Sequence, residues 1–200
     1  MKHHQYNSNY TFVKEPVDFN KYTDRSLLQY CLGATMYMPG TKDFAQAVID
    51  KKYPGLTSMV MCFEDACPEE DVPAAEQNSI HVLDTLKEAE DCGRLNYEDI
   101  PLLFFRVRSP EQFAHFASML RPEHIRYITG FNFPKFNGIN GGAYMSHLVE
   151  LNNKFGEVLY GMPIIEDARV AFKETRLLEL MAIKNICDCH KNLILNIRVG

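Results

Sequence analysis

Two adjacent acids, Glu64 and Asp65, directly follow a run of apolar residues in the sequence. Ionised carboxylates are costly to bury unless a positive group or a hydrogen-bond donor meets them, so acids at the end of a buried segment indicate either chemistry or a helix cap. Because adjacent residues of a strand face opposite ways, we expect one acid to face a site. The other would cap the next helix or bind a neighbouring backbone N–H.

Charged residues follow several other apolar runs in the same way. Arg106 carries a planar, forked guanidinium suited to binding a carboxylate through two hydrogen bonds. Glu166 offers the hard oxygen atoms that Mg2+ prefers, and Lys135 could neutralise an anion or pair with Glu64. The six runs end in Pro39-Gly40-Thr41-Lys42, Glu64-Asp65, Arg106-Val107-Arg108, Pro134-Lys135, Glu166-Asp167 and Arg198-Val199-Gly200.

Short β-rich segments precede these charged ends, and helix-like amphipathic segments alternate with them. Apolar strands that alternate with helices predict a parallel sheet covered by helices, and the carboxyl ends of such strands share one edge. We therefore expect the charged residues to meet there. The predicted strands are 33–38, 57–63, 100–107, 125–133, 157–165 and 192–199, and the predicted helices lie near 41–51, 72–91, 109–119, 143–155 and 167–188.

The turn after the first strand decides between an open sheet and a barrel. It contains one glycine, Gly40, where a Rossmann fold needs a glycine-rich turn, and the sequence has no Walker A pattern. We therefore predict an α/β fold of the TIM (β/α)8-barrel type. A full barrel has eight strands and about 250 residues, so six βα units in 200 residues predict a partial barrel or a fragment. Residues 1–25 are expected to form an arm or cap, and residues 26–200 a single barrel domain, incomplete at its C-terminus.

Composition restricts the class of partner. The formal net charge of -5 argues against nucleic acid and anionic membranes, because those partners select for clustered Lys and Arg. No stretch approaches the roughly 20 apolar residues that cross a bilayer, and the six scattered cysteines suit reduced thiols. We expect a cytoplasmic protein that acts on a small molecule and has neither nucleic-acid nor membrane partners.

Six motifs resemble, in order, the successive strand-end motifs of the HpcH/HpaI aldolase and citrate lyase beta-subunit superfamily. The resemblance covers about residues 32–200. That superfamily is a Mg2+-dependent group of TIM-barrel carbon–carbon lyases, so the resemblance implies a lyase with Mg2+, or Mn2+ in its place, as cofactor. The motifs are MYMPGTKDF, VMCFEDACPEEDVPAAE, FFRVR, FNFPKFN, YGMPIIEDARV and LILNIRVG.

The resemblance also implies roles for individual residues. Arg106 would anchor the substrate carboxylate, Glu166 would bind the metal, Glu64 and Asp65 would form the acidic pair near the reacting centre, and Lys135 would be the rim lysine. In this superfamily a second metal carboxylate follows the sixth strand, in a segment that would begin at Gly200. The first loop, with a cofactor-binding role, would be formed by Pro39, Gly40 and Thr41.

The implied reaction is cleavage or formation of a C–C bond beside a carbonyl, in a small keto or hydroxy acid or its thioester, through a metal-stabilised enolate. Arg108 stands where citrate-lyase-like members commonly have Asn, and Glu76 and Gln77 replace a common Arg, which argues against a coenzyme A or acyl-carrier thioester. The resemblance further implies a homo-oligomer. The alternative is a catalytically inactive, barrel-derived binding or scaffold protein.

Overall fold

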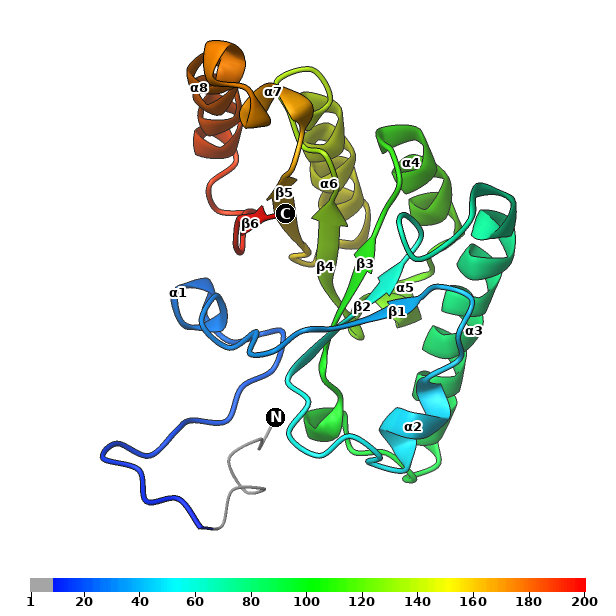
Figure 1. The fold of residues 1–200 in the computed structure, drawn as a ribbon. Coiled ribbons are helices and arrows are strands. Elements are labelled where there is room, and N and C mark those ends of the chain that lie inside the picture. Colours follow the sequence, from blue (N-terminus) through cyan, green and yellow to red (C-terminus); the bar gives the residue numbers. More distant parts are fainter. Residues whose placement is uncertain (1–8) are drawn as a thin grey trace.

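The strands form one curved sheet in which every neighbouring pair is parallel (Figure 1). The computed structural model describes residues 9–200, so the first part of the expected N-terminal arm, residues 1–8, lies outside the described chain. The curved sheet makes a half-barrel, which confirms the predicted partial TIM barrel. In chain order the strands are β1 (Met36–Pro39), β2 (Ser58–Cys62), β3 (Leu102–Arg106), β4 (Ile128–Phe133), β5 (Tyr160–Ile165) and β6 (Arg198–Val199).

The sixth strand is shorter than predicted. Regular pairing with β5 covers only Arg198 and Val199, whereas the sequence pattern predicts a strand over 192–199. The preceding residues still run beside β5, because Gly161 donates to the carbonyl of Leu193 at 2.8 Å and Leu195 donates to that of Gly161 at 3.0 Å. The predicted segment is therefore present as an irregular edge that becomes a strand at its end.

Helices and short turns of 3-10 helix connect the strands. The predicted helix over 72–91 coincides with the longest one, but the predicted helix over 167–188 is divided at Phe172, whose backbone is extended. The helical elements are α1 (Arg25–Leu28), α2 (Ala45–Ile49), η2 (Glu69–Asp71), α3 (Val72–Asp91), η3 (Tyr97–Asp99), α4 (Pro110–Met119), α5 (Pro122–Ile125), α6 (Gly141–Phe155), α7 (Ala168–Ala171) and α8 (Lys173–Cys189).

Alternating side chains of the strands separate two apolar clusters. Outward-facing residues such as Phe105 and Phe131 pack with the helices in the larger cluster. Inward-facing residues such as Phe104 and Met162 pack with Leu28 of α1 in the smaller one. The segment around α1 therefore covers part of the concave face of the sheet, and the helices cover the convex face (Figure 1).

Two strands approach each other closely at Gly130 of β4. A Cβ atom at this position would lie 2.0 Å from the carbonyl oxygen of Tyr160 in β5. Since real side chains do not tolerate such a contact, only glycine fits here without moving β4 and β5 apart. The spacing of the two strands whose ends carry Lys135 and Glu166 thus depends on this glycine.

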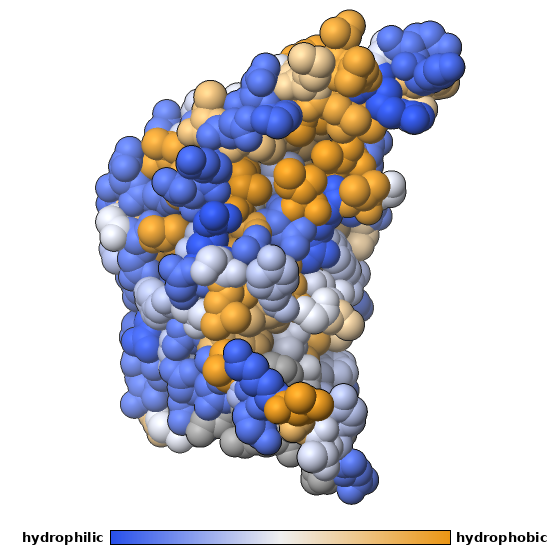
Figure 2. Space-filling model, turned by 90° about the vertical axis from the view of Figure 1, so that its left-hand side faces the viewer, coloured by the Kyte–Doolittle hydropathy of each residue, from blue (hydrophilic) through white to orange (hydrophobic). Residues whose placement is uncertain are grey.

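Apolar side chains gather on the outer surface formed by α7 and α8 (Figure 2). Exposed apolar patches of this kind are typical of interfaces. The expected homo-oligomer stays a prediction. Within residues 9–200, no helix combines the length and the apolar composition that a membrane span requires. The large exposed residues of this surface are Phe172, Leu177, Leu178 and Met181.

Candidate active site

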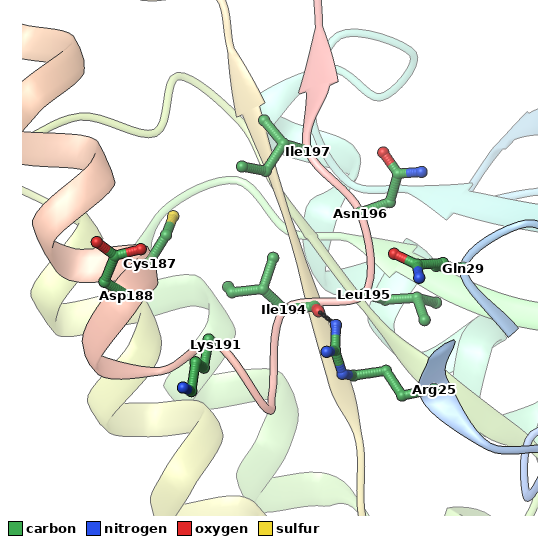
Figure 3. A pocket seen from close by; sticks show the side chains of 9 residues that line it. All are labelled: Arg25, Gln29, Cys187, Asp188, Lys191, Ile194, Leu195, Asn196 and Ile197. Carbon is green, nitrogen blue, oxygen red and sulfur yellow. Dashed lines mark hydrogen bonds between the residues drawn. The ribbon is translucent and has the colours of Figure 1, made fainter. Parts of the chain in front are cut away.

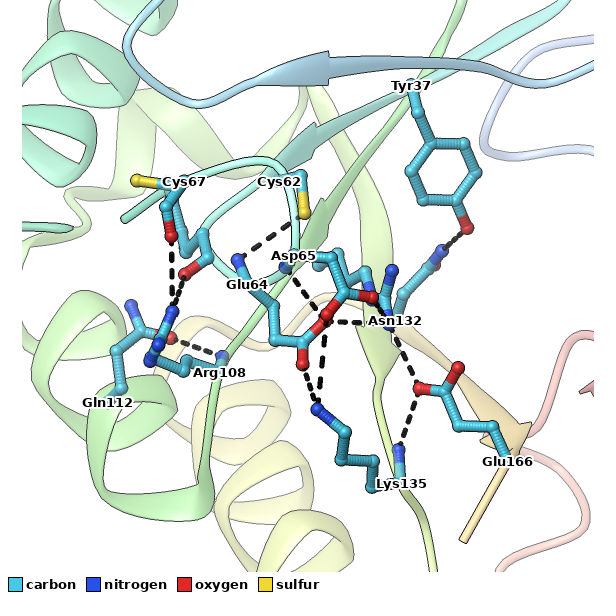
Figure 4. Close-up of polar contacts among 12 residues, drawn as sticks. Tyr37, Cys62, Glu64, Asp65, Cys67, Arg108, Gln112, Asn132, Lys135 and Glu166 are labelled. Atoms are coloured by element: carbon cyan, nitrogen blue, oxygen red, sulfur yellow. Dashed lines mark hydrogen bonds and ion pairs between the residues drawn. The ribbon is translucent and has the colours of Figure 1, made fainter. Parts of the chain in front are cut away.

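Five charged side chains from four successive strand ends meet at the carboxyl edge of the sheet (Figure 4). Glu64 and Asp65 follow β2, Arg106 is the last residue of β3, Lys135 follows β4, and Glu166 follows β5. All five were singled out in the sequence, and the structure brings all five together. Parallel strands explain this convergence, since their carboxyl ends lie at one edge of the sheet.

A single nitrogen of Arg106 holds the centre of the cluster. Its Nη2 lies 2.7 Å from an oxygen of Glu64, 2.9 Å from one of Asp65 and 2.9 Å from Oε1 of Glu166. This nitrogen carries two hydrogens, so three carboxylates exceed what it can serve with hydrogen bonds. The side chains of Arg106 and Glu64 are only 11% and 6% exposed, which makes these charges strongly interacting ones.

Lys135 supplies two different contacts to the cluster. Its Nζ donates to Oε1 of Glu64, and its backbone N–H donates to Oε1 of Glu166 at 3.1 Å. The backbone of Lys135 is left-handed, with φ of 47°, a conformation that few residues other than glycine adopt. Strain of this kind is found where surrounding contacts hold a residue in place, and here the contacts are those with the two carboxylates.

The expectation that Glu64 and Asp65 face opposite ways is wrong. Both side chains reach Arg106, because β2 ends at Cys62 and the two acids lie in the following turn, where strand alternation no longer applies. Neither acid caps α3, whose N-cap is Asp71. Glu64 does bind a neighbouring backbone N–H, since its Oε2 accepts from Asp65 at 2.9 Å.

Charge contacts change the pKa values of three members of the cluster. Burial tends to lower the pKa of Arg106, but the charges of Glu64 and Glu166 outweigh it and raise that pKa above its usual value. Burial tends to raise the pKa of Asp65, but the hydrogen bond with Glu64 and the charges of Arg106 and Lys135 outweigh it and hold that pKa below its usual value. The hydrogen bond from Lys135 to Glu64 raises the pKa of the lysine above its usual value. The raised pKa favours the cationic form of Lys135 at neutral pH.

A family model described as "C-C_Bond_Lyase of the TIM-Barrel fold" matches residues 26–200. The chain belongs to this family of carbon–carbon lyases. No curated protein matches it. The lyase family and its barrel fold agree with the fold and with the coarse reaction class predicted from the sequence.

Two residues that depart from the expected motif have structural roles in the lyase. Arg108 donates to the backbone carbonyls of Phe63 and Cys67, at 3.3 and 3.2 Å, and so holds the turn that carries the acidic pair. Glu76 is buried on α3, where it accepts from Gln112 at 2.8 Å and contacts His115 at 2.9 Å. Both residues thus position elements behind the charged cluster.

The loop after β1 lies beside the cluster without an ion pair or hydrogen bond to its five members within residues 9–200. Pro39 pairs in register with Cys62, and Gly40 donates to the carbonyl of Cys62 at 2.8 Å. A Cβ atom on Gly40 would lie 2.8 Å from the ring of Phe63, so this glycine is required by packing. Thr41 is exposed. The cofactor-binding role of Pro39, Gly40 and Thr41 stays a prediction.

Sequence reasoning missed Asn132 and Tyr37. Asn132 is fully buried on the concave side of β4, in register with Arg106, and its Nδ2 donates to the hydroxyl of Tyr37 at 2.7 Å (Figure 4). The available signal was position: Asn132 is the only amide side chain of β4 and lies two residues before Pro134. Buried amides are rare without partners, which makes such a residue a candidate for binding.

A cavity of about 400 Å³ lies apart from these strand ends, between α1, the end of α8 and the segment before β6 (Figure 3). Arg25 crosses it and donates to the carbonyl of Ile194 at 3.0 Å. None of the five clustered residues lines it. The charged cluster, rather than this cavity, is therefore the candidate active site of the lyase.

The donor set of the cluster fits a partly hydrated metal ion. Within residues 9–200, no three His, Cys, Asp or Glu residues are arranged to hold a metal by themselves. Mg2+ does not need such a cage, because it keeps several waters and binds through one or two carboxylates. Three carboxylates share one Arg106 nitrogen, so some of their oxygen lone pairs have no hydrogen-bond donor. Within residues 9–200, the hydrogen bonds of Glu166 use Oε1, and its Oε2 could bind such an ion.

Proposed function

We propose that this lyase cleaves or forms a C–C bond beside a carbonyl group, in a small keto or hydroxy acid, with Mg2+ or Mn2+ as cofactor. We propose further that it is a divergent member of the HpcH/HpaI aldolase and citrate lyase beta-subunit superfamily. The observation that carries the proposal is the convergence of Arg106, Lys135 and three carboxylates at one edge of the barrel. The free acid is favoured over a thioester because Arg108 is engaged by backbone carbonyls.

Arg106 would bind the substrate carboxylate. Its Nη2 is shared among three acids, but its Nε is buried and has no partner within residues 9–200. An unpaired N–H on a buried guanidinium is costly, and a substrate oxygen would satisfy it. Because β3 and the surrounding ion pairs fix the guanidinium, little conformational entropy is lost when it orients the substrate.

Glu166 would hold the metal ion, with Glu64 and Asp65 near the reacting carbon. A bound Mg2+ supplies Lewis-acid stabilisation of the negative charge that develops on the enolate oxygen. Lys135 stays protonated and is half-exposed, so its cation can turn from Glu64 toward an oxyanion as charge develops. Its backbone N–H meanwhile keeps Glu166 in position.

The test replaces Glu166 by Gln, which keeps the shape of the side chain and removes its charge. Glu150→Gln is the matched control, because Glu150 on α6 is 75% exposed and lies outside the cluster. Calorimetry with Mg2+ measures metal affinity, and turnover is measured with oxaloacetate and pyruvate. We expect Glu166→Gln to lose Mg2+ binding and to reduce turnover by about 10²–10³, whereas Glu150→Gln retains both.

The same experiment separates the enzyme from its rival. Metal-dependent binding of a keto acid without any turnover, in the wild-type protein, would indicate the catalytically inactive binding or scaffold protein. Near-normal turnover and Mg2+ affinity in Glu166→Gln would remove Glu166 from the metal site. Loss of both in the control variant as well would point to a general effect on folding, which circular dichroism of the two variants identifies.

A further inference from the structure

The guanidinium of Arg198 lies on the concave side of the half-barrel. Its Nη2 donates to the hydroxyl of Thr35 at 2.9 Å, and its Cζ lies 5.7 Å from the centre of the Tyr37 ring. Its Nε is buried and lacks a partner, and within residues 9–200 it forms no ion pair with a carboxylate. Arg198 thus differs from Arg106, whose charge is met by three acids.

A guanidinium in this position is costly without an anion. A hydroxyl group and an aromatic face stabilise a cation, but neither neutralises it, and a partly buried charge is normally paired. Arg198 also borders a cavity of about 290 Å³ that Leu32, Gly33, Thr35 and Asn196 help to line. Charge and space for a small anionic group therefore occur together.

A strip of polar side chains connects this place with the charged cluster. Tyr37 faces the guanidinium of Arg198 with its ring and accepts from Asn132 with its hydroxyl. Asn132 in turn lies in register with Arg106 on the neighbouring strand. The strip runs across the concave face from the end of β3 to β6.

Within residues 9–200, the buried side-chain nitrogen and oxygen atoms that lack hydrogen-bond partners all belong to this strip. In the described part of the chain they are Nε of Arg106, Oδ1 of Asn132 and Nε of Arg198. Two are donors at the ends of the strip, and the third is an acceptor between them. A ligand that satisfied all three would carry an oxyanion at each end and a hydroxyl group in between.

We infer that Arg198 anchors a second anion-binding subsite, and that the substrate is a small hydroxy acid with two oxyanionic groups. The first group would bind Arg106 and the second Arg198, with Asn132 accepting a hydrogen bond from a hydroxyl group between them. The inference rests on the proposed function, because it assigns the substrate class of the same site. It leaves open to experiment whether the second group is a carboxylate or a phosphate.

The test uses unreactive acids of equal chain length. Calorimetry in the presence of Mg2+ compares succinate, with two carboxylates, against butyrate, with one, and against 3-phosphonopropionate as the phosphate-like probe. We expect a dianion to bind about 10–100-fold more tightly than butyrate, as a charge-assisted contact implies. The stronger of succinate and 3-phosphonopropionate identifies the second group, and equal affinity of all three acids would overturn the inference.

The variant Arg198→Met removes the charge, and Arg94→Met is its control because Arg94 is exposed and belongs to the turn after α3 rather than to the strip. We expect Arg198→Met to lower dianion affinity to the level of butyrate and to leave butyrate affinity unchanged. Arg198→Lys, which keeps a cation, should restore part of the preference. A preference for dianions that persists in Arg198→Met would overturn the inference, and circular dichroism confirms that each variant is folded.

Failure of the subsite and failure of the lyase mechanism give different results. Arg198-dependent binding of a dianion, in a protein that turns over neither oxaloacetate nor pyruvate, would support the subsite and contradict the proposed function. Turnover of oxaloacetate that is unchanged in Arg198→Met would support the proposed function and contradict the subsite.

Discussion

Glu64 lies between two cations that come from different strands. Its Oε2 is 2.7 Å from Nη2 of Arg106, and its Oε1 accepts a hydrogen bond from Nζ of Lys135. Since Arg106 ends β3 and Lys135 follows β4, this one carboxylate ties the end of β2 to the ends of the next two strands. Its charge therefore contributes to the fold of the site.

Glu64→Gln should destabilise the protein. The change leaves the buried guanidinium with two acids instead of three, and it replaces one of the two oxygens that face Arg106 and Lys135 by an NH2 donor. We expect the free energy of unfolding to fall by about 1–3 kcal/mol, the usual cost of leaving a buried polar group poorly satisfied. Urea unfolding measures the change. Glu69→Gln is the control, because that side chain is 85% exposed, and an equal loss in both variants would contradict the prediction.

Arg106→Lys should impair turnover more than it impairs folding. Lysine keeps the positive charge but lacks the planar fork, so it cannot serve three carboxylates and a substrate at once. We expect kcat/KM for a keto acid to fall by about 10²–10³, with Arg94→Lys unchanged. Steady-state kinetics beside a thermal unfolding curve check this. Retention of wild-type kcat/KM would exclude Arg106 as the substrate anchor.

Asp65 should make the stability depend on pH on the acid side only. Its pKa lies below the usual 3.8, and a carboxyl group of this kind stabilises the fold above its unfolded-state pKa and loses that contribution as the pH falls further. We expect Asp65→Asn to show a flatter decline of stability through pH 3.8 and below. The effect should be small, because the side chain is 63% exposed and solvent screens its ion pairs. A decline as steep as that of the wild type, in urea unfolding over this range, would contradict the assignment.

Tyr37→Phe should cost about 1 kcal/mol of stability, since it removes the hydroxyl that accepts from the buried Asn132. Tyr30→Phe is the control, because Tyr30 is 80% exposed. Chemical unfolding of the two variants measures the difference. If the free energy of unfolding fell equally in both variants, the hydrogen bond between Tyr37 and Asn132 would make no net contribution to stability.

Local patterns predicted the regular elements of the fold. The helix over 72–91 coincides with α3, which has Pro73 in its first turn and buries residues at helical spacing, including Ala75, Val82 and Leu86. The break at Phe172 was not predicted. It depends on contacts formed after folding, because Arg176 donates to two carbonyl groups that α7 leaves unpaired at its end, those of Val170 and Ala171.

The members of the charged cluster were predictable, and their arrangement was not. Residues at the ends of parallel strands must share an edge, so Arg106 and Glu166 could be placed together from the fold alone. The orientation of Asp65 depends on where β2 ends, which the pattern places one residue too late. Asn132 was missed because a single amide in a mostly apolar strand has no visible role until its neighbour on the adjacent strand is known.

The close approach of β4 and β5 at Gly130 has a consequence for activity. The proposed reaction should be highly sensitive to substitution at this position, although glycine carries no reactive group. Adding one methyl group there would force β4 and β5 apart. The displacement would be transmitted along both strands to Lys135 and Glu166. The backbone nitrogen of Lys135 must stay 3.1 Å from Oε1 of Glu166 to keep the hydrogen bond between them. A mutational scan for activity should therefore find Gly130→Ala as harmful as the loss of a charged residue of the cluster. Gly130 has this effect although it contacts none of the five charged side chains.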